Sequence, residues 1–163
     1  MAFHLPYYAW RGSKIAYKDN RRDVDSKPLR KYRDLSFLKL DSSESPSFLY
    51  EAQISCAVAG SDGWKWVAYC FVDTYFDAGE NTRETVQSYH NDSPGDKHIR
   101  MDPLTFGVID AGKSIRNPRE YFLMVFQIRI NQVKREWQQV VAKVQQSIRE
   151  YEQVRFLYFL TSV

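Results

Sequence analysis

The feature that most constrains the fold is a long run without glycine or proline that begins after Pro118. Asn117 is a favourable N-cap, and Pro118 suits the first helical position, where its missing N–H costs nothing. Glu120 follows the cap at the spacing of a capping box. The pattern predicts one helix over about 118–155, which is about 55 Å long at 1.5 Å per residue.

Apolar residues recur along this helix at spacings of three and four. They are Phe126, Ile130, Val133, Trp137, Val140, Val144, Ile148 and Tyr151. Two interpretations remain open. The stripe is either the face that packs on a sheet, which is the commoner arrangement in α+β proteins, or a coiled-coil interface. The second interpretation predicts a homo-oligomer through the C-terminal helix. Its interface residues would be Trp137, Val140, Val144, Ile148 and Tyr151.

Two segments before the helix alternate in the manner of strands. Apolar residues share one face of 48–59, and the turn at 60–63 leads into a second strand from Trp64 to about Tyr75. This second strand is apolar on both faces, so we expect it inside a sheet or under a helix. The sequence therefore predicts an α+β fold, in which a small, mainly antiparallel sheet packs against one long C-terminal helix.

A chain of 163 residues with 44% hydrophobic residues is long enough for a core of its own. We expect an irregular basic arm over 1–33 and one α+β domain over 34–163, with a short strand at 34–40. Cys56 and Cys70 fall inside the predicted hairpin, where free thiols in a reducing compartment are expected. Adjacent strands would also permit a disulfide.

The predicted arm carries nine basic and three acidic residues between Trp10 and Arg33. Tyrosines and a tryptophan alternate with these cations, a combination suited to an anionic surface or a single-stranded nucleic acid. The candidate residues are Arg11, Lys14, Lys18, Arg21 and Arg22. No nucleic-acid-binding module accompanies them, so nucleic acid is an unlikely partner. The alternative is that the arm docks on the acidic middle of the chain.

Four carboxylates follow the second strand: Asp73, Asp77, Glu80 and Glu84. Such hard oxygen ligands hold Mg²⁺ or Ca²⁺, although their order lacks the alternation of an EF-hand loop. Mg²⁺ is the one cofactor that the sequence suggests. No nucleophile–base pair or phosphate-binding loop is recognisable, and we therefore expect a protein that is not an enzyme.

The sequence contains neither a run of 18 apolar residues nor a signal peptide at its start, which favours a cytoplasmic location. The last residues, 156–163, are nearly all apolar. We expect them to dock in the core or on a partner, or to continue into a longer protein.

Five short runs carry a family resemblance: 66–69, 71–74, 117–123, 128–130 and 136–137. They resemble the soluble N-terminal part of uncharacterised fungal proteins of the CorA-like, magnesium-transporter-like group. The resemblance covers roughly Leu35 to Gln153. It implies a soluble regulatory or assembly domain on the cytosolic side of a membrane, feeding a long helix toward a downstream membrane region. It also implies regulatory divalent-ion binding. The Gly-Met-Asn pore signature of true CorA channels is absent, so no transport residue carries over.

Overall fold

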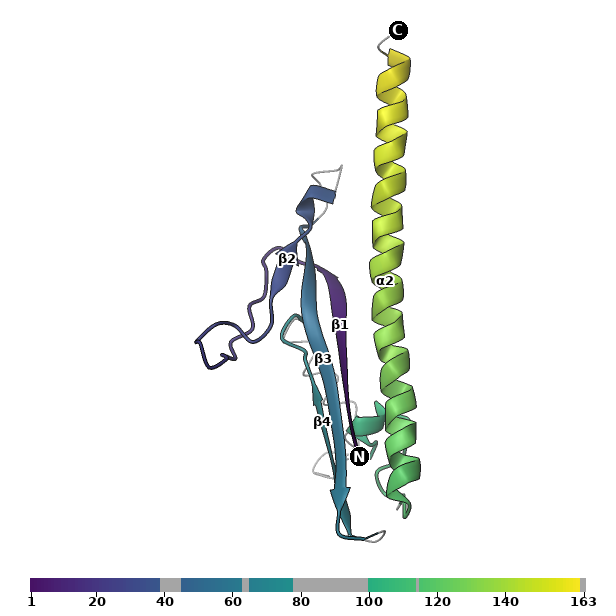
Figure 1. Cartoon of the computed structure of the whole chain (residues 1–163). Coiled ribbons are helices and arrows are strands. Elements are labelled where there is room, and N and C mark those ends of the chain that lie inside the picture. The colour runs from purple at the N-terminus through teal and green to yellow at the C-terminus, as the bar shows by residue number, and fades with distance from the viewer. Residues whose placement is uncertain (39–44, 63–64, 78–99, 114, 162–163) are drawn as a thin grey trace, which may run out of the picture. The chain divides into compact units, whose positions relative to one another are not determined.

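The computed structural model describes residues 1–38, 45–62, 65–77, 100–113 and 115–161, the last seven as backbone alone. Figure 1 shows an α+β chain, as predicted, with a four-stranded antiparallel sheet and one long C-terminal helix. The strands are β1 (Ala2–Gly12), β2 (Tyr32–Asp34), β3 (Ser47–Gly60) and β4 (Trp66–Val72), and the helix is α2 (Pro118–Thr161). Two 3-10 turns, η1 (Ser36–Leu38) and η2 (Pro103–Thr105), complete the regular structure of the described residues.

The chain divides into two compact units. Unit 1 contains Met1–Pro6 and Gln53–Val133, and unit 2 contains Tyr7–Ala52 and Lys134–Val163. The predicted boundary between 33 and 34 lies inside unit 2. Because β1, β3 and α2 each pass from one unit into the other, each unit has its own portion of sheet and its own portion of helix.

Strand β3 is the centre of the sheet in both units, with β1 along one side. On its other side β3 pairs with β2 in unit 2 and with β4 in unit 1, both antiparallel. The predicted alternation of β3 is confirmed, since all six residues of its apolar face are buried: Phe48, Tyr50, Ala52, Ile54, Cys56 and Val58. The predicted hairpin with β4 is confirmed as well.

The prediction of an irregular segment over 1–33 was wrong for Ala2–Gly12, which is strand β1, and for Tyr32 and Arg33, which belong to β2. Phe3, Tyr7 and Ala9 are buried at the period of two that a strand requires. Pro6 obscured this pattern, but a proline is tolerated where the backbone N–H has no partner to pair with. The predicted strand at 34–40 was wrong for 35–38, because the Asp34 carboxylate, at the end of β2, accepts a hydrogen bond from Ser36 N–H and turns the chain into η1. Residues 39 and 40 lie outside the described part of the chain.

Strand β4 was predicted to be covered on both faces, and this was wrong for the described residues. Val67, Tyr69 and Phe71 are 51% to 69% exposed. β4 pairs with β3. The other face of β4 carries Trp66 and Cys70, which are half-buried. Apolar character on both faces therefore did not mean burial on both faces here.

Helix α2 begins where predicted and continues past the predicted end at 155. The Asn117 side chain caps it by accepting a hydrogen bond from Arg119 N–H at 3.0 Å. In unit 1 its first turns pack on the sheet through aromatic rings. Phe3 of β1 lies 5.6 Å and 5.3 Å from Phe122 and Phe126, and Trp66 of β4 lies 5.1 Å from Tyr121, measured between ring centroids.

Candidate functional site

The packed face of α2 in unit 1 differs from the predicted stripe. The buried residues are Tyr121, Val125, Arg129 and Val133, which recur at every fourth position. Of the predicted stripe, Val133 is buried, but Ile130 is 37% exposed. The true contact face is rotated toward a tyrosine and an arginine, two residue types that an apolar pattern does not select.

Arg129 anchors the 3-10 turn η2 to the helix. Its guanidinium donates hydrogen bonds to the carbonyl oxygens of Pro103 (2.8 Å) and Leu104 (3.1 Å) and to Gln132 Oε1 (2.9 Å). It also lies 5.4 Å from the centroid of the Phe106 ring, a cation–π distance. The positive charge of Arg129 is therefore buried, with three hydrogen-bond acceptors and an aromatic ring as its partners.

A second buried bond fixes the same turn. Tyr121 donates its hydroxyl hydrogen to Asp102 Oδ2 at 2.7 Å, and Asp102 Oδ1 accepts from Leu104 N–H. Burial and the neighbouring carboxylate raise the pKa of Tyr121. Trp66, Asp102 and Tyr121 line a hollow of about 550 Å³, but the Asp102 oxygens already accept two internal bonds. We therefore interpret the hollow as a structural feature of unit 1.

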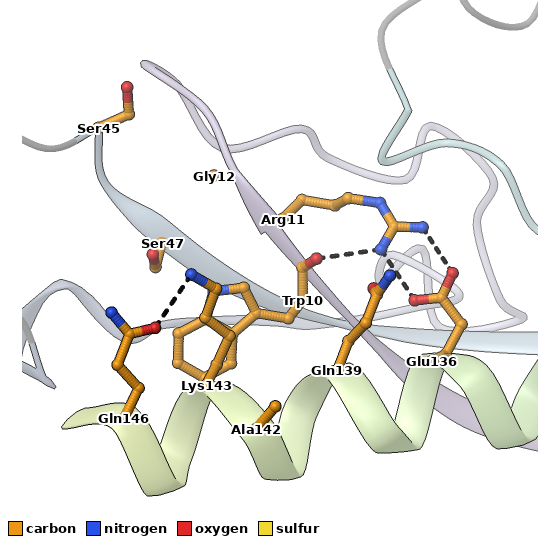
Figure 2. A pocket seen from close by; sticks show the side chains of 10 residues that line it. All are labelled: Trp10, Arg11, Gly12, Ser45, Ser47, Glu136, Gln139, Ala142, Lys143 and Gln146. Atoms are coloured by element: carbon orange, nitrogen blue, oxygen red, sulfur yellow. Dashed lines mark hydrogen bonds and ion pairs between the residues drawn. The ribbon is translucent and has the colours of Figure 1, made fainter. Parts of the chain in front are cut away.

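In unit 2, α2 turns a polar face toward the sheet, as Figure 2 shows. The helix contributes Glu136, Gln139, Ala142, Lys143 and Gln146 to an open groove of about 920 Å³ whose other wall includes Trp10 and Arg11 of β1. Arg11 donates from both terminal nitrogens to the two carboxylate oxygens of Glu136, each at 2.8 Å. The Arg11–Glu136 pair and the ring contact between Tyr8 and Trp137 hold this part of the helix to β1.

Another side of α2 carries an exposed apolar stripe, here called the outer seam, whose first residue, Trp137, also packs edge-on against Tyr8 of β1. It consists of Trp137, Val141, Val144, Ile148 and Tyr151, which are 38% to 60% exposed. None of the described residues from Lys134 to Val154 is buried. Of the five predicted interface residues, four lie in this seam. Val140 is half-buried beside it, and Val141, which the sequence pattern did not select, takes its place.

The spacing of the outer seam is four, three, four and three, which is the repeat of a coiled-coil contact line. With Val141 and Ile148 at positions a, the d positions are Trp137, Val144 and Tyr151. The five helix residues that line the groove then fall at b, c and f, on the side of the helix away from the a and d positions. The charges of Arg135, Glu136, Lys143, Arg149 and Glu150 also fall at b and c, whereas Lys134 falls at a and Glu152 at e.

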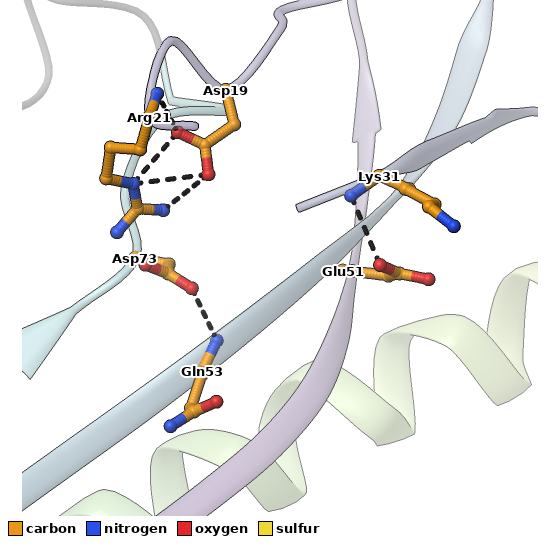
Figure 3. A network of polar contacts seen from close by, with 6 residues as sticks. All are labelled: Asp19, Arg21, Lys31, Glu51, Gln53 and Asp73. Carbon is orange, nitrogen blue, oxygen red and sulfur yellow. Dashed lines mark hydrogen bonds and ion pairs between the residues drawn. The ribbon is translucent and has the colours of Figure 1, made fainter. Parts of the chain in front are cut away.

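The predicted anion-binding residues do not form one open cationic surface. Arg11 is paired with Glu136, and Arg21 makes a two-oxygen ion pair with the buried Asp19, as Figure 3 shows. Burial alone would raise the pKa of Asp19, but the hydrogen bonds from Arg21 outweigh it and lower that pKa. Lys14, Lys18 and Arg22 are exposed.

The aromatic residues predicted to stack with bases are also engaged. Tyr7 and Trp10 are buried, and the Tyr8 ring lies edge-on to Trp137 with centroids 5.7 Å apart. Tyr17 donates its backbone N–H to the hydroxyl of the buried Tyr50 at 3.1 Å. These aromatic residues therefore make contacts within the chain.

The predicted metal ligands are only partly described. Asp73 is buried, and its carboxylate accepts a hydrogen bond from Gln53 N–H at 2.9 Å, which joins the end of β4 to β3 (Figure 3). Glu80 and Glu84 lie outside the described residues. Asp77 is the last residue of the described range 65–77. Within the described part of the chain, no three His, Cys, Asp or Glu side chains gather in a way that would hold a metal ion.

Comparisons with known proteins return no matching family, no matching curated protein and no matching solved structure. Among the described helices, none has both the length and the apolar character needed to cross a membrane.

Proposed function

We propose that this chain is a non-enzymatic assembly domain, in which the outer seam of α2 pairs with the same seam of a second copy. The observation that carries this proposal is the exposed heptad stripe, whose residues differ from the helix residues that line the groove in unit 2. Trp137, at the start of the stripe, also packs on Tyr8 of β1. As the resemblance implies, the domain would serve a regulatory or assembly role within a larger CorA-like protein.

A second copy is favoured as the occupant by the residues that flank the seam. In a two-stranded coil the e and g positions face each other across the interface. Here they are Gln138, Val140, Gln145, Ser147, Glu152 and Val154. Five of these six are uncharged, so like charges do not oppose self-pairing. The β-branched residues at the a positions, Val141 and Ile148, also suit a two-stranded coil.

The free energy available is sufficient for a reversible dimer. Fully burying an aliphatic or aromatic side chain contributes about 1.5–3 kcal/mol, and the five seam residues are about half exposed. About 5 kcal/mol per chain is therefore available before the entropic cost of association. Pairing would also support a helical segment that has few contacts of its own, because helices of this length are marginal alone in water.

Light scattering on the purified chain over about 1–200 µM tests the proposal. We expect the mass to rise from 19.2 kDa toward twice that value. Ile148→Glu places a charge at the seam and should weaken dimerisation at least about 100-fold. Gln146→Glu adds the same charge on the opposite face and should change it less than about threefold. A wild-type chain that stays monomeric throughout, or equal effects of the two variants, would overturn the proposal.

A further inference from the structure

We infer that Cys56 and Cys70 form a site of reversible oxidation, at which a peroxide converts the two thiols into a disulfide across the β3–β4 hairpin. Both cysteines are free thiols in the structure. They are directly opposite each other in the antiparallel register of unit 1. This inference is independent of helix pairing.

The hydrogen-bond pattern of the hairpin identifies the kind of pair that the two cysteines make. Asp73 N–H donates to Gln53 O, and Ser61 N–H donates to Lys65 O, each at 3.1 Å. In an antiparallel ladder, hydrogen-bonded and non-hydrogen-bonded pairs alternate. Residues 53 and 61 are both odd-numbered, so the even-numbered β3 residues, Cys56 among them, belong to non-hydrogen-bonded pairs.

A non-hydrogen-bonded pair is the position where a cross-strand disulfide fits. The Cα atoms of such a pair are about 4.5 Å apart. A disulfide spans Cα separations of about 4.4–6.8 Å. Directly opposed residues project to the same face of the sheet, so the two sulfur atoms share one side. The backbone therefore does not need to move for the bond to close.

The two thiols differ in access. Cys56 is 1% exposed, whereas Cys70 is half-buried on β4 and lies nearer to solvent. Peroxide is small enough to reach a half-buried sulfur, so Cys70 is oxidised first and Cys56 acts as the resolving thiol. This is the arrangement of a reversible thiol pair, in which the exposed member has a partner beside it.

The reaction balances with peroxide as the oxidant. The Cys70 thiolate attacks one peroxide oxygen, the O–O bond breaks, and the leaving hydroxide takes the thiol proton to form water. Cys70 is then a sulfenic acid. The Cys56 sulfur attacks the Cys70 sulfur, the S–O bond breaks, and the leaving hydroxide takes the Cys56 proton as a second water. Two thiols are oxidised to one disulfide, and one peroxide is reduced to two waters.

Burial sets the rate of this reaction. It raises the pKa of Cys56 to about 11 and that of Cys70 in the same direction, although the positive charge of Arg129 opposes the shift at both sulfurs. Thiolate is therefore scarce at neutral pH, and the pair stays reduced until peroxide is in excess. Oxidation should be faster at higher pH.

The experiment treats the native full-length chain with hydrogen peroxide and follows intact mass, a peptide map and thermal unfolding. We expect a loss of about 2 Da, a cross-linked peptide containing both cysteines, and an unfolding temperature about 5 °C or more above that of the reduced chain. Reduction by dithiothreitol should reverse all three changes.

The variants Cys56→Ser and Cys70→Ser are the controls, and neither should show the mass loss or the gain in unfolding temperature. The inference is overturned if the wild-type chain accumulates oxygen adducts or intermolecular disulfides instead. It is equally overturned if the disulfide forms but lowers the unfolding temperature, because the bond would then distort the hairpin.

Discussion

Arg11 and Glu136 are 125 positions apart in the sequence, yet their side chains meet in a bidentate ion pair with both N···O distances at 2.8 Å. The pair joins β1 to the polar face of α2 within unit 2. Its two side chains are largely shielded from water, at 27% and 14% exposed. It is thus a shielded, two-oxygen ion pair that joins distant parts of the sequence within unit 2.

The first prediction concerns this pair. Replacing either member by alanine should lower the free energy of unfolding by about 1–3 kcal/mol, because a charged hydrogen-bonding group loses its partner away from bulk water. A double-mutant cycle of Arg11→Ala and Glu136→Ala, followed by urea unfolding, isolates the coupling. A coupling below about 0.3 kcal/mol would mean that the pair is no more than a surface contact.

The second prediction concerns the buried Arg129. Arg129→Met should cost about 2–4 kcal/mol of unfolding free energy, since the carbonyls of Pro103 and Leu104 lose their donor. Arg129→Lys should recover little of this loss, because an ammonium lacks the planar fork that reaches both oxygens. Arg135→Met, an exposed change on the same helix, is the control and should cost less than about 0.5 kcal/mol. Equal costs at 129 and 135 would refute the anchoring role.

The main architecture was predictable because it depends on local signals. The helix start follows from Asn117 and Pro118, and the β3 face follows from strict alternation over 48–58. The contact face of α2 was not predictable, because its central member is Arg129. The Arg129 guanidinium can be buried because the carbonyl oxygens of η2 accept its hydrogen bonds. The position of those oxygens depends on tertiary structure.

The candidate site was predictable in part. The spacing of Trp137, Val144, Ile148 and Tyr151 indicated a seam, but the pattern could not distinguish Val140 from its neighbour Val141. That choice depends on which side of the helix the groove occupies, and Glu136 with Arg11 determines it. The charge distribution suggested docking of the basic arm on the acidic middle of the chain as one interpretation, but the partners of Arg21 and Arg11 are Asp19, within the arm itself, and Glu136, on α2.

The third prediction concerns alkaline pH. The pKa of Cys56 is raised from 9.0 to about 11, mainly by burial, and that of Tyr121 is raised as well. These groups lose their protons at a lower pH in the unfolded chain than in the folded chain. The stability that they contribute is therefore fully present below about pH 9 and is lost as the pH rises through 11. Urea unfolding at pH 8, 9.5 and 10.5 should show this decline, and Cys56→Ala should make it shallower. Stability that is flat across the range in both proteins would show that neither shift is real.

The fourth prediction concerns the exposed face of β4. Phe71→Thr should change the unfolding free energy by less than about 0.5 kcal/mol, because the ring is 69% exposed and threonine suits a strand. Ile54→Ala, on the buried face of the adjacent strand, should cost about 2–5 kcal/mol. Urea unfolding compares the two, and a cost above about 2 kcal/mol at Phe71 would place that face in contact with another part of the protein.

Amide hydrogen exchange along α2 in a dilution series tests pairing through the outer seam. In the proposed dimer, 118–133 is stabilised by packing within the chain, whereas 134–154 is stabilised by a second copy. On dilution from about 200 µM to about 1 µM, exchange in 134–154 should accelerate at least about tenfold while exchange in 118–133 stays unchanged. Protection in 134–154 that does not vary with concentration would contradict pairing through the outer seam.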